Sequence, residues 1–490
     1  MKEQEFIRHI EEGYQLIPVS KAIDNLNLDP IDVYENLADR SKSYLFESLE
    51  GQKDWSRYTI IGLPSNDYIE VSQNQIRIYE NNQLVKKVMT ENPVKWIENY
   101  HKSFRVFQDS TLPQFQGGLV GYFGFDTIKY FEPNIKYKTQ KDTMETPDIC
   151  LIVSKKLLIF DKIKNAINII IYAENNLDSF LQAEKEILDK IDYLNKFSKP
   201  HNFTNQKEIN EDIKISYDLE KSDFISSVKK IKQYIMNGDA MQVVLSQRMS
   251  MPFYNKPISF YRELRSLNPS PYMYYLNMGD HHIVGSSPEI LVRLEDNLIT
   301  VRPIAGTRPR GKNVVEDDLL AIELKNDSKE IAEHLMLIDL GRNDVGKVSK
   351  IGSIKLTDKM IIEKYSHVMH MVSNVTGDIL DNLGMMDVLK STFPAGTVSG
   401  APKFRAIEII YELESIKRGI YAGAIGYLGW NGNMDTAIAI RTCVIKDGIL
   451  HIQCGAGIVN DSVPELEWDE TINKGKAIVQ AYKNLRIKKI

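Results

Sequence analysis

Residues 148–173 read DICLIVSKKLLIFDKIKNAINIIIYA, and this run carries the strongest indication of how the chain folds. Its apolar blocks are short, rich in β-branched residues and bounded by Lys, Asp and Asn, which is typical of strands joined by turns. Segments 59–65 and 68–88 have the same pattern, with Asn-rich turns. A helix is expected to follow near 176–194.

The second half of the chain mixes strands and helices in a similar way. Apolar residues recur at helical spacing from Phe224 to Gly238, short strands are expected between 241 and 301, and a helix over 316–337. Strand blocks joined by hairpin turns predict largely antiparallel sheets with helices packed outside, an α+β fold. The polar segment 199–216 predicts a boundary between an N-terminal unit, 1–200, and a C-terminal unit, 217–490.

Composition excludes several classes of protein. The 490 residues include 61 Lys and Arg against 66 Asp and Glu, a net charge of -5, which gives no electrostatic reason to expect a nucleic acid or an anionic membrane as partner. The three cysteines form no CxxC pair, so neither a disulfide framework nor a thiolate zinc site is indicated. No apolar run approaches the roughly 20 residues that span a bilayer, and no leader pattern opens the chain. A soluble cytoplasmic protein is expected.

Two pairs of acids point to a metal. Glu467 and Glu470 open a helix face that continues through Lys474 into apolar residues, so docking of that face would carry both carboxylates inward, where they need a cation. Glu330 and Glu333 repeat the spacing. Two such pairs around one ion favour magnesium, because all the ligands are hard oxygens. The alternatives are a solvated first turn for the C-terminal pair and a capping box for Glu330.

The chain has three glycine-rich segments, 302–311, 393–403 and 454–459. None of them matches the phosphate-binding motifs GxxxxGK(S/T) and GxGxxG. Their backbone N–H groups are candidates for holding a carboxylate, and tight turns are the alternative. Arg441 interrupts an apolar strand pattern, which suggests a buried anionic partner. Glu289 and His370 carry no distinctive signal when each is taken alone.

Nine segments in this order resemble the chorismate-utilising enzymes and, among them, the large subunits of anthranilate synthase. They are GDAMQVVLSQR, GSSPEI, RPIAGTRPRG, AEHLMLIDLGRND, SHVMHMVS, FPAGTVSGAPK, YAGAIGYLG, CGAGIV and the ELEWDET helix. The resemblance implies two large antiparallel sheets packed as a sandwich with flanking helices. It also implies conversion of chorismate and ammonia to anthranilate and pyruvate, with Mg²⁺ at the substrate's ring carboxylate.

The resemblance assigns roles to residues of this chain. Glu333 and Glu470 are expected to bind the ion, supported by Glu330 and Glu467. Glu289 is expected to protonate the departing C4 hydroxyl, and His370 to act as base or orienting group when pyruvate leaves. The substrate-holding residues implied are Gly306, Thr307, Thr397, Tyr421, Arg441, Gly455, Ala456, Gly457 and Lys474, and Thr307 and Gln242 are counted with the catalytic group as well.

Two positions favour the anthranilate branch. Relatives that add water carry a lysine in place of Gln242, and aminodeoxychorismate synthases carry a nucleophilic lysine in place of Ala305. Aminodeoxychorismate synthase component I and a non-catalytic, tryptophan-sensing subunit are the alternatives. Since no glutaminase nucleophile elbow is visible, ammonia is expected from a partner glutamine amidotransferase, in a heterotetramer of two large and two small subunits.

Segment 44–62 resembles the family's tryptophan-feedback motif. The inhibitor pocket implied by this resemblance consists of Glu47, Ser48, Arg57, Pro271, Tyr272 and Met273, with Glu47 at the ligand's ammonium group. The alternative is that these segments only pack the two units together.

Overall fold

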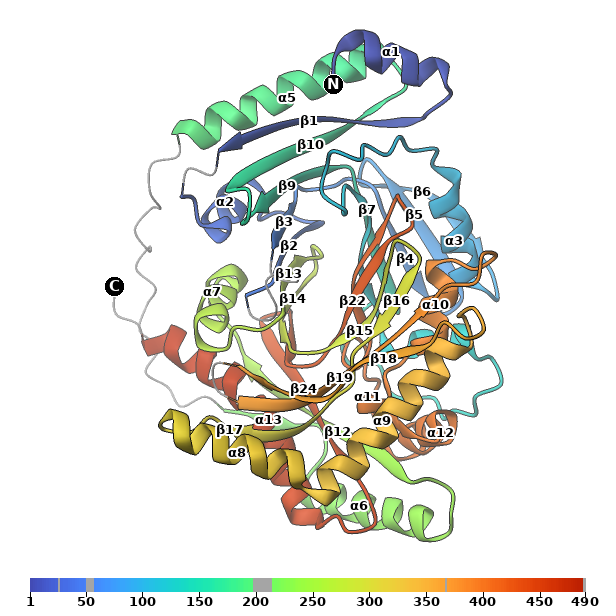
Figure 1. The fold of residues 1–490 in the computed structure, drawn as a ribbon, viewed down its shortest axis with the longest axis vertical. Coiled ribbons are helices and arrows are strands. Elements are labelled where there is room, and N and C mark those ends of the chain that lie inside the picture. The colour runs from blue at the N-terminus through green and yellow to red at the C-terminus, as the bar shows by residue number, and fades with distance from the viewer. Residues whose placement is uncertain (25–26, 50–56, 197–213, 366–367, 488–490) are drawn as a thin grey trace.

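Two antiparallel twelve-stranded sheets form the centre of the computed structural model, with helices around them (Figure 1). The structure describes residues 1–24, 27–49, 57–196, 214–365 and 368–487. The expected linker 199–216 therefore lies outside the described residues as far as residue 213. This architecture confirms the α+β prediction.

The strands of each sheet follow in spatial order. The first sheet contains β1 (Leu16–Asp24), β10 (Ala166–Glu174), β9 (Lys156–Asp161), β3 (Tyr58–Gly62), β2 (Ser43–Glu47), β13 (Tyr272–Asn277), β14 (His281–Ser287), β23 (Thr442–Lys446), β24 (Ile449–Ile458), β12 (Gln242–Pro252) and β11 (Ser216–Tyr217), with β20 (Gly400–Ala401) beside β12. The second contains β17 (Ile304–Pro309), β19 (Val368–Asp378), β16 (Leu298–Val301), β15 (Ile290–Glu295), β22 (Met434–Ile438), β21 (Ala424–Gly429), β7 (Gly118–Phe123), β8 (Ile149–Ser154), β4 (Tyr68–Ser72), β5 (Gln75–Glu80) and β6 (Gln83–Met89), with β18 (Lys355–Lys364) beside β19.

The helices are α1 (Glu3–Glu11), α2 (Pro30–Leu37), α3 (Pro93–Ser103), α4 (Ile128–Phe131), α5 (Leu177–Lys196), α6 (Lys221–Met236), α7 (Pro257–Leu267), α8 (Val314–Asn326), α9 (Ser328–Gly346), α10 (Met385–Thr392), α11 (Gly396–Ser399), α12 (Lys403–Leu413) and α13 (Pro464–Ile487). A short 3₁₀ turn, Phe125–Thr127, precedes α4. Among the described residues, no helix combines the length and apolarity needed to cross a membrane.

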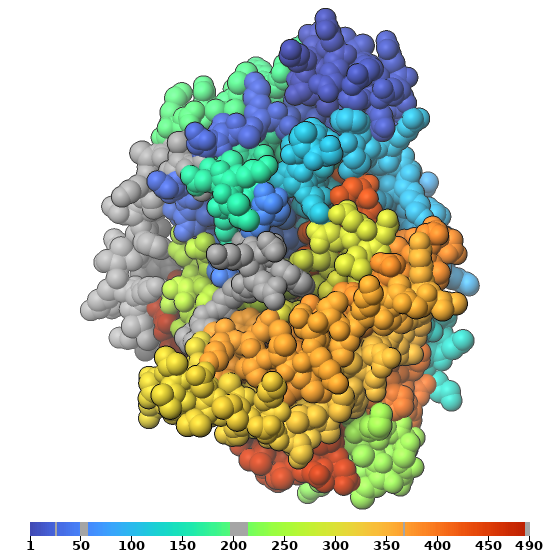
Figure 2. Space-filling view, in the orientation of Figure 1, coloured from blue at the N-terminus to red at the C-terminus, as the bar shows by residue number. Residues whose placement is uncertain are grey.

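Both sheets take strands from both halves of the chain. In the first sheet β2 pairs with β13, with Glu47 opposite Met273, and in the second β7 pairs with β21. In the space-filling view the blue N-terminal residues form the top of the molecule and yellow to red residues form most of the bottom (Figure 2). The sheets run through both regions, so residues on either side of the predicted boundary at 199–216 are joined by main-chain hydrogen bonds.

The chain passes from one sheet to the other at several short crossings. Only Lys155 separates β8 of the second sheet from β9 of the first. Two further crossings lie side by side, since the N–H of Ser286 donates to the carbonyl of Arg441 (3.1 Å) and that of Ile438 donates to the carbonyl of Glu289 (3.0 Å). Glu289 and Arg441 therefore occupy neighbouring crossings between the sheets. The sequence pattern placed Arg441 inside a strand. In the structure it lies between β22 and β23, and its φ is 51°.

Several other sequence expectations need correction. The helix expected over 316–337 is two helices, because the Asp327 carboxylate accepts from the N–H groups of Lys329 (3.0 Å) and Glu330 (3.2 Å) and starts α9 afresh. Helix α7 lies within the region expected to hold only short strands. The glycine-rich segments at 302–311 and 454–459 are largely strands, β17 and β24, rather than turns.

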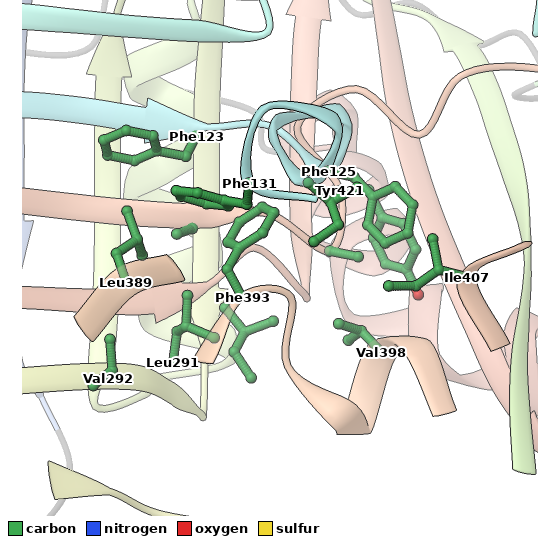
Figure 3. Packing of buried hydrophobic residues seen from close by; sticks show 14 of the residues in the cluster. Phe123, Phe125, Phe131, Leu291, Val292, Leu389, Phe393, Val398, Ile407 and Tyr421 are labelled. Carbon is green, nitrogen blue, oxygen red and sulfur yellow. The ribbon is translucent and has the colours of Figure 1, made fainter. Parts of the chain in front are cut away.

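A buried cluster of aromatic and aliphatic side chains supports the segment that carries Thr397 (Figure 3). The rings of Phe131 and Phe393 meet edge to face, with their centroids 5.6 Å apart. Val398 and Ile407 pack into the same cluster. Burying such side chains is worth about 1.5–3 kcal/mol each. The cluster therefore holds α10, α11 and α12 firmly against the strands that carry the site.

Candidate active site

Glu289 is a buried carboxyl group at the crossing between β14 and β15. Its Oε1 accepts a hydrogen bond from the Thr397 hydroxyl at 3.1 Å. Burial raises the pKa of Glu289 to about 8, although Thr397 and the charge of Lys474 act to lower it. A carboxyl group in this state is largely protonated at neutral pH and is able to donate a proton.

His370 lies on β19 directly opposite Thr307 of β17. Its Nδ1 is 3.0 Å from the carbonyl oxygen of Gly306 and 3.1 Å from the Thr307 hydroxyl. Because a carbonyl only accepts, we assign the proton to Nδ1, which leaves the Nε2 lone pair available. Burial lowers the pKa of His370, and the positive charge of Arg441 lowers it further, so the ring is neutral and can act as a base.

Two glycines of β24 allow side chains of the site to approach the strand. A Cβ atom on Gly455 would lie 2.7 Å from the Tyr421 hydroxyl, and one on Gly457 would lie 2.5 Å from Nε2 of Gln242. Residues 455–457, including Ala456, pair with β12, so they form part of the sheet rather than the open turn their sequence indicated. These glycines bring Tyr421 and Gln242 against the strand.

Lys474 of α13 connects the strand and the helix. Its Nζ donates to the carbonyl of Gly455 (2.9 Å) and pairs with Oε1 of Glu470 (2.7 Å). The Arg441 guanidinium donates to the main-chain carbonyl of Lys474 at 3.1 Å. Arg441, Lys474 and Glu470 thus lie together and join α13 to the crossing beside Glu289.

The four acids proposed as metal ligands are neighbours but form no single cluster. Oε1 of Glu333 accepts from Nε2 of Gln242 at 3.4 Å, and burial together with the charge of Glu330 raises the pKa of Glu333. Burial raises the pKa of Glu467, and the charge of Glu470 raises it further. Within the part of the chain that the structure describes, no three His, Cys, Asp or Glu side chains are spaced to hold a metal.

Two of these acids are paired with cations of the chain, which corrects the expected convergence. Glu470 is not carried into the interior, since 46% of its side chain is exposed and Lys474 neutralises it. Glu330 pairs with Arg308 at 3.3 Å. Burial, together with the neighbouring acids, raises the pKa of Glu333 and of Glu467, and the carboxylate oxygens of these residues are the donor type that a hard divalent cation prefers.

Apart from the residues described above, a cavity of about 160 Å³ lies between the two sheets. Five of the six residues expected to bind an inhibitor line it: Glu47, Ser48, Pro271, Tyr272 and Met273. Arg57 does not; it forms a two-pronged ion pair with Asp161, at 3.0 and 2.6 Å. Glu47 already accepts from the Tyr261 hydroxyl (2.7 Å) and from Arg265 (2.9 Å), so its charge is compensated within the protein.

The sequence interpretation overlooked Arg418, a fully buried guanidinium beneath the site. It donates to both oxygens of Glu414 (2.8 and 2.6 Å), to the carbonyl of Val398 (2.7 Å) and to that of Val244 (2.8 Å). It also lies 5.5 Å from the ring of Tyr421. One side chain thereby ties together β12, α11 and Tyr421. Its only signal in the sequence is a charged residue placed just before the apolar run that starts at residue 420.

The chain matches the family model described as chorismate binding enzyme over residues 46–480. Anthranilate synthase component 1 of Pseudomonas aeruginosa is 48% identical over 98% of both chains, and that of Aquifex aeolicus is 45% identical over 97% of both. The crystal structure of anthranilate synthase component I from Streptococcus pneumoniae superposes with a TM-score of 0.77 at 38% identity, covering 93% of this chain and 98% of that one.

The menaquinone-specific isochorismate synthase of Escherichia coli superposes with a TM-score of 0.69 at 16% identity, over 98% of both chains, and shares the fold. The chain therefore belongs to the chorismate-binding enzymes. Its full-length relatives at 45–48% identity place it, within that family, among the anthranilate synthase component 1 proteins.

Proposed function

We propose that this chain is the large subunit of a Mg²⁺-dependent anthranilate synthase, a lyase that converts chorismate and ammonia to anthranilate and pyruvate. The observation that carries the proposal is a buried carboxyl group, Glu289, whose pKa burial raises to about 8, near Lys474 and next to the crossing that carries Arg441. Full-length similarity to proteins named anthranilate synthase component 1 supports the same reaction.

The first half of the reaction replaces a hydroxyl group with ammonia. Hydroxide is a poor leaving group, so Glu289 donates its proton to the C4 oxygen and water departs while ammonia adds at C2. The ammonium group formed at C2 then loses one proton to give the amine. Gln242, held by Glu333, is a neutral amide that cannot activate water, which favours ammonia as the nucleophile. Arg441 and Lys474 bind the carboxylates of the substrate.

The second half removes the enolpyruvyl group as pyruvate. Nε2 of His370 accepts the C2 proton, and its Nδ1–H stays on the carbonyl of Gly306, which fixes the ring. The C2–H electrons form a ring double bond as the C3–O bond breaks, and the released enolpyruvate takes up a proton at its methylene carbon to become pyruvate. Glu333 and Glu470, with Glu330 and Glu467 nearby, are the residues that would hold Mg²⁺, which would supply positive charge at the ring carboxylate. Together with Arg441 and Lys474, that charge would favour a dianionic substrate.

The proposed activity is tested by incubating the purified chain with chorismate, ammonium and Mg²⁺ and following anthranilate fluorescence. We expect anthranilate and pyruvate to appear in equal amounts, and omission of Mg²⁺ to stop the reaction. If the chain were instead an aminodeoxychorismate synthase component I, the product would carry its amino group at C4 and keep the enolpyruvyl group. That product alone would overturn the proposal.

Ammonia is proposed to come from a separate glutaminase subunit, in an assembly of two large and two small chains. All three cysteines of this chain are buried, and burial raises the pKa of Cys150 to about 12 and that of Cys454 to about 11. A thiol in that state is a poor nucleophile. The relatives are named component 1, which also implies a second component.

Tryptophan is proposed to inhibit by binding the cavity between the sheets. Tyr272 and Tyr427 supply aromatic walls, and Arg293 and Asp435, which pair with each other at 2.6 Å, are charged groups in the lining that a zwitterion could reach. Replacing half-buried Ser48 with Phe should fill this cavity and raise the half-inhibitory concentration of tryptophan about tenfold or more, equivalent to ~1.4 kcal/mol. Steady-state inhibition curves check this, with exposed Ser222→Phe on α6 as the matched control. Equal inhibition of both variants would show that the ligand binds elsewhere.

A further inference from the structure

A small pocket lies against Glu289, bordered by α9 and by the segment that joins α10 to α11. It has a volume of about 50 Å³, and its polar wall includes Arg302, Asp344 and Thr392 in addition to Glu289 and Thr397. A water molecule needs roughly 10–15 Å³ of such space and two or more polar partners. The pocket is therefore large enough for a short chain of water molecules, and its polar side chains are set in a mostly apolar wall.

The pocket has a mouth and a polar far wall. Leu340, Gly341 and Ala395 line it and are partly exposed, so water can enter between α9 and α11. Beyond Thr392, the Nζ of buried Lys403 donates to Oδ2 of Asp344 (2.7 Å) and to the carbonyl of Thr392 (3.1 Å). This ion pair is held in place by the fold and can orient water along the wall.

The chemistry gives such a route a use if Glu289 is the acid of the proposed function and the proton lost by the nitrogen added at C2 leaves to solvent. In each turnover the O–H bond of Glu289 breaks, a new O–H bond forms on the substrate's C4 oxygen, and the C4–O bond breaks to release water. Glu289 is left as a carboxylate and must take up one proton before the next turnover. Its Oε1 is engaged by Thr397, and bound substrate would cover the side facing Lys474.

We propose that this pocket returns the proton to Glu289 from solvent, through water aligned by Thr392 and by the Asp344–Lys403 pair. The inference rests on the proposed function and adds a proton route to it. It makes Leu340 and Ala395 determinants of turnover although neither is among the residues expected to bind the substrate. The pocket acts on the recovery of the acid and not on substrate affinity.

The test narrows the pocket without touching its polar wall. Leu340→Phe adds bulk at the mouth, Leu340→Met keeps the volume, and Ala395→Val is a second filling variant should Leu340→Phe fold poorly by circular dichroism. We expect both filling variants to lower kcat about tenfold, to leave the KM for chorismate unchanged and to raise the solvent deuterium isotope effect on kcat. Leu340→Met should behave as the unmodified chain.

The outcomes separate this inference from the proposed function. Normal kcat and isotope effect in correctly folded filling variants would overturn the proton route and leave the proposed activity standing. An equal loss in Leu340→Met would also overturn the route, because that change does not fill the pocket. Absence of anthranilate from the unmodified chain would overturn both the activity and the route.

Discussion

Glu289→Gln is expected to lower kcat by about 10²–10⁴-fold while the KM for chorismate changes by no more than about twofold. The amide has the shape of the acid and can still accept from Thr397, but it has no acidic proton to donate. In the unmodified chain kcat should fall as pH rises through about 8, where Glu289 ionises. Exposed Glu174→Gln is the matched control, and a Glu289→Gln variant that retained this basic limb would remove Glu289 from the acid role.

The same substitution should change how stability depends on pH. The folded pKa of Glu289, about 8, lies above its ordinary value of 4.5, so between these limits the folded chain keeps a proton that the unfolded chain has lost. The unmodified chain therefore loses about 1.4 kcal/mol of unfolding free energy per pH unit in that window, and the variant does not. Thermal melts at pH 5 and pH 8 should show the variant gaining relative stability at the higher pH. A difference independent of pH would contradict the raised pKa.

Glu333→Gln and Glu470→Gln are the second pair of changes with large expected effects. Each removes one carboxylate from the proposed Mg²⁺ ligands, and we expect Mg²⁺-dependent turnover to be lost and Mg²⁺ affinity in calorimetry to fall about 10-fold or more. Glu465→Gln is the matched control, because this acid is exposed on the first turn of the same helix as Glu470.

Calorimetry without substrate separates metal binding from catalysis. If Glu470→Gln bound Mg²⁺ normally and remained active, the pairing of Glu470 with Lys474 would be its whole role, and the ligand assignment would be wrong. If only Glu333→Gln lost the ion, the site would be confined to α9.

The strands of 148–173 were predictable because short β-branched blocks between turn residues leave few alternatives. It was not predictable that β8 and β9 belong to different sheets. The alternation of apolar and polar residues indicates which face of a sheet a residue takes, but not which sheet the strand joins. Helix α7 was missed for a related reason: its eleven residues interrupt a region whose flanking segments all read as strands.

The site was predictable as a set of segments and not as a set of contacts. Glu289 looks like an ordinary acid after a turn, and its burial depends on tertiary neighbours such as Thr397 and the crossing that carries Arg441. Pairings such as Glu330 with Arg308, or Arg57 with Asp161, depend on which residues the tertiary fold brings near. A resemblance in sequence names the positions, but the charge that each one meets is a property of the packed structure.

The protonation state of Glu289 tests the account most directly. Infrared difference spectra between the unmodified chain and Glu289→Gln should show one buried, protonated carboxyl band at pH 7 that disappears with a midpoint near pH 8. A carboxylate band at pH 7, with a midpoint near the ordinary value of 4.5, would mean that Glu289 cannot serve as the acid.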